Sequence, residues 1–299
     1  MQELLNLQQW CLDSLNTAPS CGNNCPIGHY CTQCGATDCD CSRCLNHIQW
    51  GQPNFSYSCY KITYQYTLRF FNRFASEICY AMLSYNYSKP LPRLNVVSLG
   101  CGPGSEVFGI IKAFKMMNMN VTIHYEGHDL IDVWEPIQRK VVDSFNGLPH
   151  AINFHTSNLF ADYHKFEDGK INLLVLNYLL SHAAKFYSLQ QKNQFIDDIV
   201  DFVIQNGVRN ILFNDINYYG SYASLNSGTQ LMKLLINKLR VAGVKHSVSY
   251  AYFPGDPYRG GENWKGYNSG ALVFSNLKGN TFTANVGCCS SKQIFLHIQ

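Results

Sequence analysis

Hydrophobic residues in the larger, C-terminal part of the chain follow two alternating patterns. Short apolar runs such as 171–177 are typical of strands that are covered on both faces of a parallel sheet. Longer segments with apolar residues at every third or fourth position predict helices. The expected strands lie at 94–99, 121–126, 152–156, 171–177 and 208–214, and the expected helices at 105–117, 132–145, 189–205 and 227–242. This alternation predicts an α/β fold whose sheet is mostly parallel, with helices on both faces.

The segment after these units contains strands without intervening helices. They are expected near 246–253, 270–275 and 283–297. Strands that follow one another directly favour antiparallel pairing, because parallel pairing needs a long crossover. The sheet is therefore predicted to carry antiparallel strands from the last part of the chain.

The N-terminal part has a different organisation. Apolar residues recur with helical spacing in 2–16 and in 60–85. Between these two predicted helices, residues 19–59 are rich in Cys, Gly, Asn and Pro and show no sustained period. Two prolines after the second helix mark a candidate boundary. We therefore predict a small Cys-rich and helical region at 1–90, followed by the sheet domain at 91–299.

Composition narrows the classes of protein. Charged residues make up 14% of the 299 residues, and the net charge is +3. A mildly basic chain permits a nucleic-acid partner without requiring one. No apolar run approaches the ~18–20 residues of a membrane span, and the N-terminus lacks a signal-peptide pattern. We expect a cytoplasmic or nuclear protein that is not secreted and has no membrane partner. The sequence does not predict an oligomeric state.

Cysteine is concentrated in one segment. Of the thirteen cysteines, seven lie between Cys21 and Cys44. In a chain that is not secreted, close cysteines are more typical of metal ligands than of disulfides, because the cytosol keeps thiols reduced. The Cys-x2-Cys pairs Cys31/Cys34 and Cys41/Cys44 have the spacing of tetrahedral zinc sites.

The segment offers eight ligands, which is enough for two four-coordinate zinc ions. The candidate ligands are Cys21, Cys25, Cys31, Cys34, Cys39, Cys41, Cys44 and His47. Cys59 and His29 are alternates, so the partition between two ions is open. An iron–sulfur cluster and disulfides are the other interpretations. Closed zinc sites would be structural, and the metal would supply folding free energy that this apolar-poor segment lacks.

Residues 96–106, Val-Val-Ser-Leu-Gly-Cys-Gly-Pro-Gly-Ser-Glu, join a predicted buried strand to a predicted helix through a glycine turn. Glycine is expected there because the backbone must adopt positive φ and approach a ligand closely. We expect the amide groups of the turn and of the helix N-terminus to face that ligand. The glycines Gly100, Gly102 and Gly104 have the spacing G-x-G-x-G, which disfavours the G-x-G-x-x-G pattern of nicotinamide enzymes.

This turn, with the strand before it and the helix after it, resembles motif I of the class I S-adenosylmethionine (SAM)-dependent methyltransferases. By order and spacing, the resemblance covers about residues 94–220. It implies a Rossmann-like methyltransferase domain that uses SAM as its methyl donor. In such a sheet the ligand binds beyond the C-terminal ends of the strands.

The next strand ends supply further candidate contacts to SAM. Asp129 could accept hydrogen bonds from both ribose hydroxyls, or it could cap the helix that begins near Asp132. Asn158, beside Leu159, stands where the family usually has an acid that reads the adenine amino group. Its amide oxygen can accept that bond, and an Asx turn is the alternative. Asn177 lies in the region that resembles motif IV, where the methyl group faces the acceptor.

One position departs from the family pattern. The family usually has Asp or Glu two positions before the first glycine of motif I, where this chain has Ser98. In the family that acid orients the turn and the methionine amino group. Glu106 or Asn177 could replace it here. Otherwise the affinity for SAM is low, or the site is degenerate.

The acceptor is less constrained by the sequence. His182 after the fourth strand and Asp215 after the fifth are candidate catalytic residues beside the methyl group. An ordinary polar role for His182 and a capping role for Asp215 are the alternatives. Tyr218, Tyr219 and Tyr222 could stack on a flat acceptor or serve in packing.

We predict a zinc-containing SAM-dependent methyltransferase that acts on RNA, with the zinc region supporting substrate binding or the fold. A basic surface track that includes Arg43, Lys61, Arg69 and Arg73 would favour RNA. A deep closed pocket would favour a small-molecule or protein acceptor. An occluded glycine turn would favour an inactive methyltransferase-like adaptor.

Overall fold

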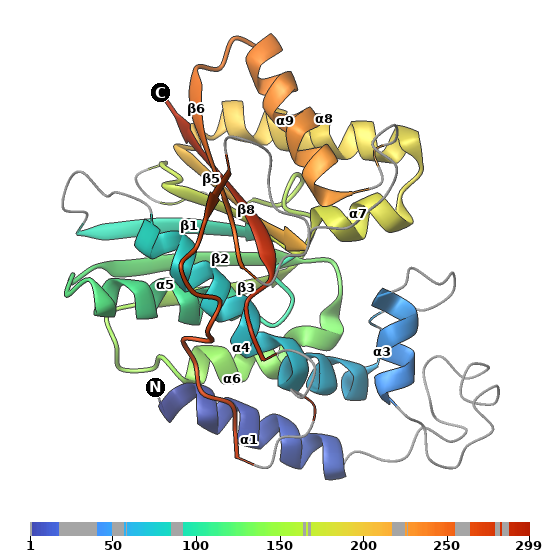
Figure 1. The fold of residues 1–299 in the computed structure, drawn as a ribbon, viewed down its shortest axis with the longest axis vertical. Coiled ribbons are helices and arrows are strands. Elements are labelled where there is room, and N and C mark those ends of the chain that lie inside the picture. The colour runs from blue at the N-terminus through green and yellow to red at the C-terminus, as the bar shows by residue number, and fades with distance from the viewer. Residues whose placement is uncertain are drawn as a thin grey trace.

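The computed structural model describes residues 2–17, 41–49, 57, 59–84, 92–163, 166, 169–216, 225, 227–254, 264–278, 282 and 287–299. Within these residues, eight strands form one sheet in the order β3-β2-β1-β4-β5-β8-β6-β7. Figure 1 shows this sheet crossing the molecule between groups of helices. The predicted α/β class, with a mostly parallel sheet and antiparallel strands from the end of the chain, is confirmed.

Five strands of the sheet are parallel and set the position of the site. They are β1 (Arg93–Leu99), β2 (Thr122–Asp129), β3 (Ala151–Thr156), β4 (Leu173–Asn177) and β5 (Asn210–Ile216). The chain proceeds from β1 through β2 to β3 on one side and then returns to place β4 on the other side of β1. The topological switch point, where ligands bind in open parallel sheets, therefore lies between β1 and β4.

The remaining strands distinguish this sheet from the dinucleotide-binding fold. They are β6 (His246–Tyr252), β7 (Trp264–Gly266) and β8 (Ser291–Ile298). Strand β8 pairs with β5 in the antiparallel direction and lies between β5 and β6. The dinucleotide-binding fold places a sixth parallel strand beyond β5, so the antiparallel β8 argues against that fold.

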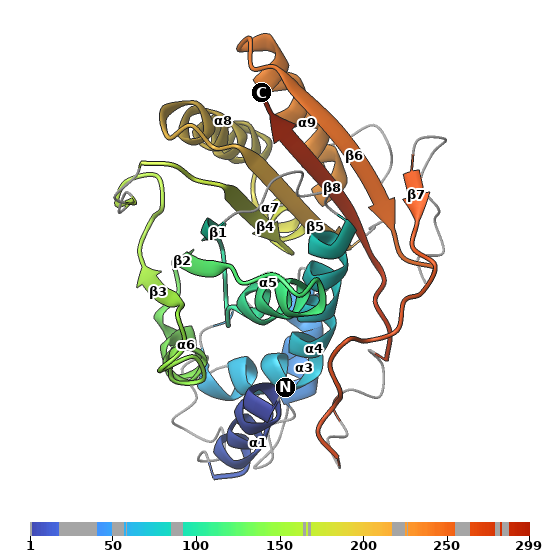
Figure 2. The same ribbon diagram turned by 90° about the vertical axis from the view of Figure 1, so that its left-hand side faces the viewer.

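Alternate side chains of the strands enter two cores on opposite faces of the sheet. Val96 of β1 joins a buried cluster with the helices of one face, whereas the next residue, Val97, joins the cluster on the other face. The first cluster includes α4 (Tyr60–Ser84), α5 (Ser105–Met116) and α6 (Glu135–Asp143), and the second includes α7 (Leu180–Phe186), α8 (Leu189–Gln205) and α9 (Gly228–Val241). Figure 2 shows the two groups of helices on either side of the strands.

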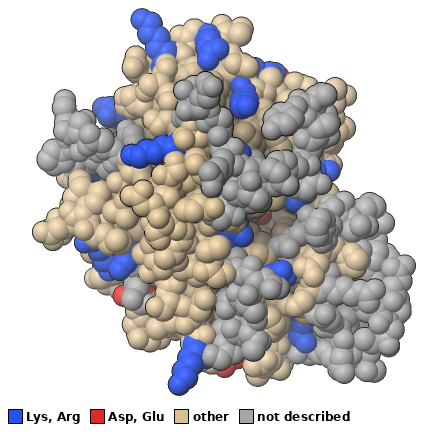
Figure 3. Space-filling view, viewed as in Figure 1, with Lys and Arg blue, Asp and Glu red and all other residues tan. Residues whose placement is uncertain are grey.

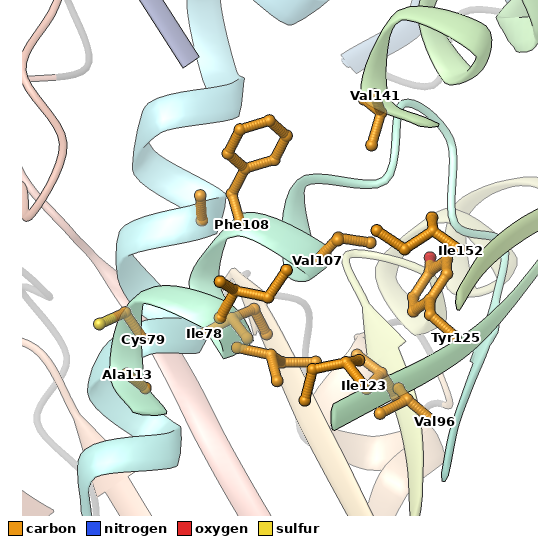
Figure 4. Close-up of a cluster of buried hydrophobic side chains, with 14 of the residues drawn as sticks. Ile78, Cys79, Val96, Val107, Phe108, Ala113, Ile123, Tyr125, Val141 and Ile152 are labelled. Atoms are coloured by element: carbon orange, nitrogen blue, oxygen red, sulfur yellow. The ribbon is translucent and has the colours of Figure 1, made fainter. Parts of the chain in front are cut away.

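Two of the N-terminal helices contribute to the first of these cores. Leu4 of α1 (Gln2–Thr17) and Ile78 of α4 lie in the same cluster as Val96 and Phe108, and Figure 4 shows Ile78 and Phe108 among its members. Gly109 lets α5 lie directly against α4, because a Cβ there would be 2.4 Å from the carbonyl oxygen of Ala75. The packing of α4 therefore places side chains such as Glu77 beside the C-terminal ends of β4 and β5. Among the described helices, none is long and apolar enough to cross a bilayer.

The strand predicted at 270–275 is wrong. Ala271 forms only an isolated bridge with Cys288, and the backbone that follows is bound by side chains of α4. Asn72 donates to the carbonyl oxygen of Ser275 (3.0 Å), and the amide of Val273 donates to Ser76 Oγ (2.9 Å). The backbone groups of this apolar segment are thus satisfied by a helix instead of by a neighbouring strand. The short elements β7, α7 and α3 (Cys41–Gln49) were not predicted, and the helix predicted at 132–145 begins with a 3-10 turn, η1 (Asp132–Trp134), before α6.

Candidate functional site

A cavity of about 460 Å³ opens at the C-terminal ends of β1, β2 and β4. This volume falls in the range of small-molecule sites, ~300–1,000 Å³. Of the residues that the sequence singled out, the cavity is lined by Gly100, Gly102, Asp129, Asn158, Leu159, Asn177 and His182. The structure therefore brings together residues that are up to about eighty positions apart along the chain, at the place that the strand order predicts.

The three glycines of the turn adopt positive φ, at 64° for Gly100, 49° for Gly102 and 75° for Gly104. A Cβ at Gly100 would lie 2.6 Å from Leu179, and one at Gly104 would lie 2.5 Å from Phe154. The protein's own side chains therefore crowd both positions, although the flexible end of Leu179 at Gly100 can shift more easily than the ring of Phe154 at Gly104. A Cβ at Gly102 would have only Trp134 within 4 Å, at 3.7 Å, so Gly102 is the glycine that keeps the cavity open.

The amides of the turn are used differently from our expectation. The N–H groups of Gly100 and Cys101 both donate to the carbonyl oxygen of His128, at 2.8 and 3.1 Å. The N–H of Gly102 donates to Asp129 Oδ2 at 2.9 Å. The expectation that the turn amides face a ligand is wrong for these three groups, because the neighbouring strand end accepts them. The turn contributes to the cavity through its lack of side chains, which leaves space next to the backbone of Gly102.

Asp129 connects the glycine turn to the end of β2. Besides the bond to Gly102, its Oδ1 accepts from the amide of Ile131 at 3.1 Å. Burial raises the pKa of Asp129, and the backbone donors of Gly102 and Ile131 oppose that shift. An ionised carboxylate has about four acceptor positions, so it can hold these two amides and still accept from a ligand in the cavity. Asp129 therefore braces the turn and presents an acceptor to the cavity.

Ser98 lies beneath the turn and faces an acid from the following helix. Its hydroxyl donates to Glu106 Oε1 at 2.5 Å, and the hydroxyl of Tyr125 donates to the same oxygen at 2.8 Å. Burial raises the pKa of Glu106, while these two hydroxyls lower it. Glu106 is fully buried and does not line the cavity, whereas Asn177 lines it and donates to Ser105 Oγ at 3.3 Å. An acid thus lies next to Ser98, but it comes from α5 instead of β1.

Asn158 and Leu159 follow β3 and line the cavity, and Asn158 is exposed to solvent. The side chain of Asn158 accepts from the amide of Phe160 at 3.1 Å, which is an Asx turn. The amide oxygen of Asn158 has a second lone pair, and its NH2 group can donate, so the side chain can also hydrogen-bond a ligand in the cavity. Leu159 is buried in the second core and fixes this strand end.

His182 lines the cavity from α7. Its ring lies 4.5 Å from that of Phe186 and 6.3 Å from that of Tyr57, between centroids. Burial and, to a smaller extent, the charge of Lys185 lower the pKa of His182 to about 4. The imidazole is therefore neutral at pH 7 and offers one ring nitrogen as a hydrogen-bond acceptor.

Asp215 is fully buried and is not among the residues that line the cavity. Its Oδ2 accepts from the amide of Ser181 in the first turn of α7, and its Oδ1 accepts from the amide of Ile216, both at 2.8 Å. This is the capping role that the sequence analysis held as the alternative. Tyr218, Tyr219 and Tyr222 lie outside the described residues.

The buried cap predicts an unusual dependence of stability on pH. Burial raises the pKa of Asp215 from 3.8 to about 6, so the folded protein binds more protons than the unfolded chain between these values. The free energy of unfolding should therefore fall as the pH rises through this window. Relative to wild type, Asp215→Asn should gain about 2 kcal/mol between pH 4 and pH 7. Urea unfolding at both pH values measures this difference, and a constant difference would contradict the burial argument.

A buried polar network behind the cavity was missed by sequence reasoning. Glu77 of α4 accepts from Arg73 Nε (2.9 Å), from the hydroxyl of Tyr178 (2.9 Å) and from Asn214 Nδ2 (3.0 Å). Arg73 Nη2 also donates to the Tyr178 hydroxyl at 2.8 Å. The available signal in the sequence was the spacing of Arg73 and Glu77, which lie one helical turn apart in α4.

The network holds a residue of the cavity wall in an uncommon conformation. Tyr178 follows β4 with φ at 55°, which is the left-handed region, and its amide donates to the carbonyl oxygen of Asn214 at 2.8 Å. Its ring stacks on Phe74 with centroids 3.8 Å apart and lines the cavity. Helix α4 therefore fixes the position of Tyr178 at the mouth of the site.

The candidate zinc ligands fall mostly outside the described residues. Those outside are Cys21, Cys25, Cys31, Cys34 and Cys39. Cys41, Cys44 and His47 lie along α3, where both cysteines are buried. Within the described part of the chain, no group of three or more His, Cys, Asp or Glu side chains could hold a metal ion. The zinc sites therefore stay a prediction.

Comparisons with known proteins give likenesses of fold only. No family model and no curated protein matches the chain. Among solved structures, the plantazolicin methyltransferase BpumL in complex with SAH is 13% identical, with a TM-score of 0.43 over 91% of this chain and 99% of that one. The magnesium protoporphyrin IX methyltransferase ChlM from Synechocystis PCC 6803 with bound SAM is 12% identical, with a TM-score of 0.41 over 96% of this chain and 97% of that one. The mitomycin 7-O-methyltransferase MmcR is 11% identical, with a TM-score of 0.44 over 93% of this chain and 70% of that one. At TM-scores below 0.5, these likenesses carry no argument about what this chain binds.

Proposed function

We propose that this chain is a SAM-dependent methyltransferase whose methyl donor occupies the cavity at the ends of β1, β2 and β4. The observation that carries the proposal is the pairing of Gly102 with Asp129. A left-handed glycine turn opens onto the cavity, and its amide is held by a carboxylate from the end of the next parallel strand, at 2.9 Å. This combination at a topological switch point is suited to a nucleoside ligand.

The residues present fit SAM. The space in front of Gly102 would be filled by any side chain at that position, so the cavity can take a ligand that lies against the backbone. Asp129 would hold the ribose hydroxyls, Asn158 and Leu159 would lie against the adenine, and Asn177 would contact the methionine end. When bound, SAM supplies an electrophilic methyl group. The G-x-G-x-G spacing and the antiparallel β8 argue against a nicotinamide cofactor at this place.

The chain's own part in methyl transfer would be alignment and exclusion of water. Side chains of Tyr66, Trp134 and Tyr178 line the cavity and would limit the access of water. The neutral imidazole of His182 can accept a hydrogen bond from an O–H or N–H of the acceptor and so orient its lone pair. No further base is required where the acceptor nitrogen carries a free lone pair.

The RNA acceptor stays a prediction that the described residues do not strengthen. Arg73 is buried in the network with Glu77 and Tyr178, so it is not part of a surface track. Arg69 donates to Asn46 Oδ1 at 3.0 Å, and the side chain of Arg43 lies outside the described residues. On the face shown in Figure 3, the described Lys and Arg side chains are scattered and do not form a continuous band.

Methyl transfer from radiolabelled SAM into a cell extract tests the proposed function. The extract is then separated into RNA, DNA, protein and small molecules, so that the label identifies the class of acceptor. Asp129→Ala should remove the label, and Asp162→Ala, a change at an exposed carboxylate outside this cavity, should leave it unchanged. Absence of label with the wild-type protein, together with absence of SAM binding, would favour an inactive adaptor.

The zinc prediction has its own measurement. If the Cys-rich segment holds two structural ions, the purified chain should contain about two zinc per molecule by atomic emission after dialysis. Treatment with a strong chelator should then lower the thermal stability of the protein, because metal binding contributes folding free energy. Iron in place of zinc, or a metal-free protein whose stability is unaffected by the chelator, would contradict the prediction.

A further inference from the structure

We propose that the acceptor in this cavity is a planar aromatic small molecule without negative charge. The inference rests on the proposed function, because it assigns the part of the cavity that SAM would leave to a second ligand. It is carried by two independent properties of the lining: an aromatic wall that is held rigidly, and the absence of Lys and Arg among the described lining residues.

The aromatic wall is formed by residues that are distant in the sequence. The ring of Tyr66 on α4 lies 5.3 Å from that of Trp134 and 5.4 Å from that of Tyr57, between centroids. Tyr57 in turn lies 5.5 Å from Trp134 and 6.3 Å from His182. All four of these rings line the cavity. Such walls bind flat π-systems well, because ring contacts add to the burial of apolar area.

The opposite part of the wall is fixed by hydrogen bonds. Tyr178 is stacked on Phe74 and its hydroxyl is bound by both Arg73 and Glu77, so its ring cannot turn away without breaking buried bonds. A ring that is already ordered loses little conformational entropy when a ligand stacks beside it. The cavity is thus organised for a rigid acceptor before that acceptor binds.

Charge is the second property. Among the described residues that line the cavity there is neither Lys nor Arg, and the two lining residues with charged side chains are Asp129 and Asp198. Asp198 Oδ1 accepts from Gln194 Nε2 at 2.9 Å, also within the lining. The nearby guanidinium of Arg73 is committed to Glu77 and Tyr178, and Lys185 of α7 does not line the cavity. An anionic ligand would therefore be desolvated without a counter-charge, which is costly.

These two properties distinguish a small aromatic acceptor from an RNA acceptor. A nucleobase within RNA would also stack on the wall, but its flanking phosphates need cations close to the site. Among the described lining residues, the charged side chains are the carboxylates of Asp129 and Asp198. Phosphate-bearing acceptors are therefore disfavoured by the same side chains that favour a neutral ring.

The test uses matched pairs of ligands that differ in one charge. The wild-type chain is saturated with S-adenosylhomocysteine (SAH), the unreactive product of SAM, and titrated by calorimetry with 2-naphthol and 6-hydroxyquinoline, neither of which chelates zinc. The same titrations are made with the sulfonated form of each compound. We expect both neutral compounds to bind at least about tenfold more tightly than their sulfonates, which corresponds to about 1.4 kcal/mol.

A pair of variants then tests the wall itself. Tyr57→Phe keeps the ring and should bind the neutral compounds as the wild type does, whereas Tyr57→Leu should weaken them about tenfold or more. Tyr250→Leu, which removes a ring 5.0 Å from that of Trp264 and outside the cavity lining, is the matched control and should have no effect.

The outcomes separate the inference from the proposed function. If SAH binds but the sulfonates bind as tightly as the neutral compounds, or none of the four binds, the inference is wrong and the proposed function is untouched. If a short RNA displaces the neutral compounds from the SAH-bound chain, the acceptor is RNA and the inference is wrong. If SAH itself does not bind, the proposed function fails, and the inference fails with it.

Discussion

Replacing Gly102 with arginine should abolish SAM binding and leave the protein folded. A side chain at this position points into the cavity, where the nearest protein atom to its Cβ would be in Trp134 at 3.7 Å, so it displaces the ligand and not the core. The left-handed φ of 49° adds about 1–2 kcal/mol of backbone strain, which a domain of this size tolerates. We expect the affinity for SAM, measured by calorimetry, to fall by more than about 100-fold.

Gly147→Arg is the matched control for this variant. Gly147 also has positive φ, at 80°, but a Cβ there has no neighbour within 4 Å, and the residue is exposed. The control therefore carries the same kind of strain and the same added charge without touching the cavity. SAM affinity should be unchanged in Gly147→Arg. An equal loss in both variants, or normal affinity in Gly102→Arg, would show that the cavity does not hold SAM.

The second large effect is expected at Glu77, because Glu77→Gln leaves the buried guanidinium of Arg73 without its carboxylate. The side chain of Glu77 is fully buried, and that of Arg73 is 13% exposed. Breaking a buried ion pair from one side costs about 3–5 kcal/mol, because the remaining charge stays desolvated. The amide also accepts fewer of the bonds that Tyr178 and Asn214 now donate. Urea unfolding should show the free energy of unfolding reduced by that amount.

An exposed ion pair with the same four-residue spacing along a helix provides the control. Glu135 pairs with Arg139 one helical turn away, and the two side chains are 54% and 74% exposed. Glu135→Gln should cost no more than about 0.5 kcal/mol, because solvent screens the pair. If Glu77→Gln and Glu135→Gln were equally mild, the network behind the cavity would not hold Tyr178 in place.

Local patterns were sufficient to predict most of the fold. The strands that begin near Arg93, Thr122 and Asn210 were each expected to within about two residues at their N-terminal ends, because their apolar runs face two cores. The segment near 270–275 has the same apolar character but forms no strand. Its backbone partners are Asn72 and Ser76, which lie 203 and 197 positions earlier in the chain, and no local pattern contains that information.

In the candidate site, too, residues fixed by their own strand could be predicted from the sequence, whereas contacts between distant residues could not. The glycine turn and Asp129 could be placed from the sequence, because each follows a buried strand whose end is fixed by the sheet. The Glu77 network could not, because its bonds to Tyr178 and Asn214 join residues 101 and 137 positions apart. Asp215 matched a catalytic position by order along the chain, but only the packing of α7 shows that its carboxylate caps a helix.

The most direct test of the account is equilibrium binding of SAH and of NADH to the purified wild-type chain, measured side by side by calorimetry. The glycine spacing, the acceptor from Asp129 and the antiparallel β8 predict that SAH binds at one site per chain and that NADH does not compete for it. Binding of NADH in place of SAH, or binding of neither, would contradict the claim that this cavity holds a methyl donor.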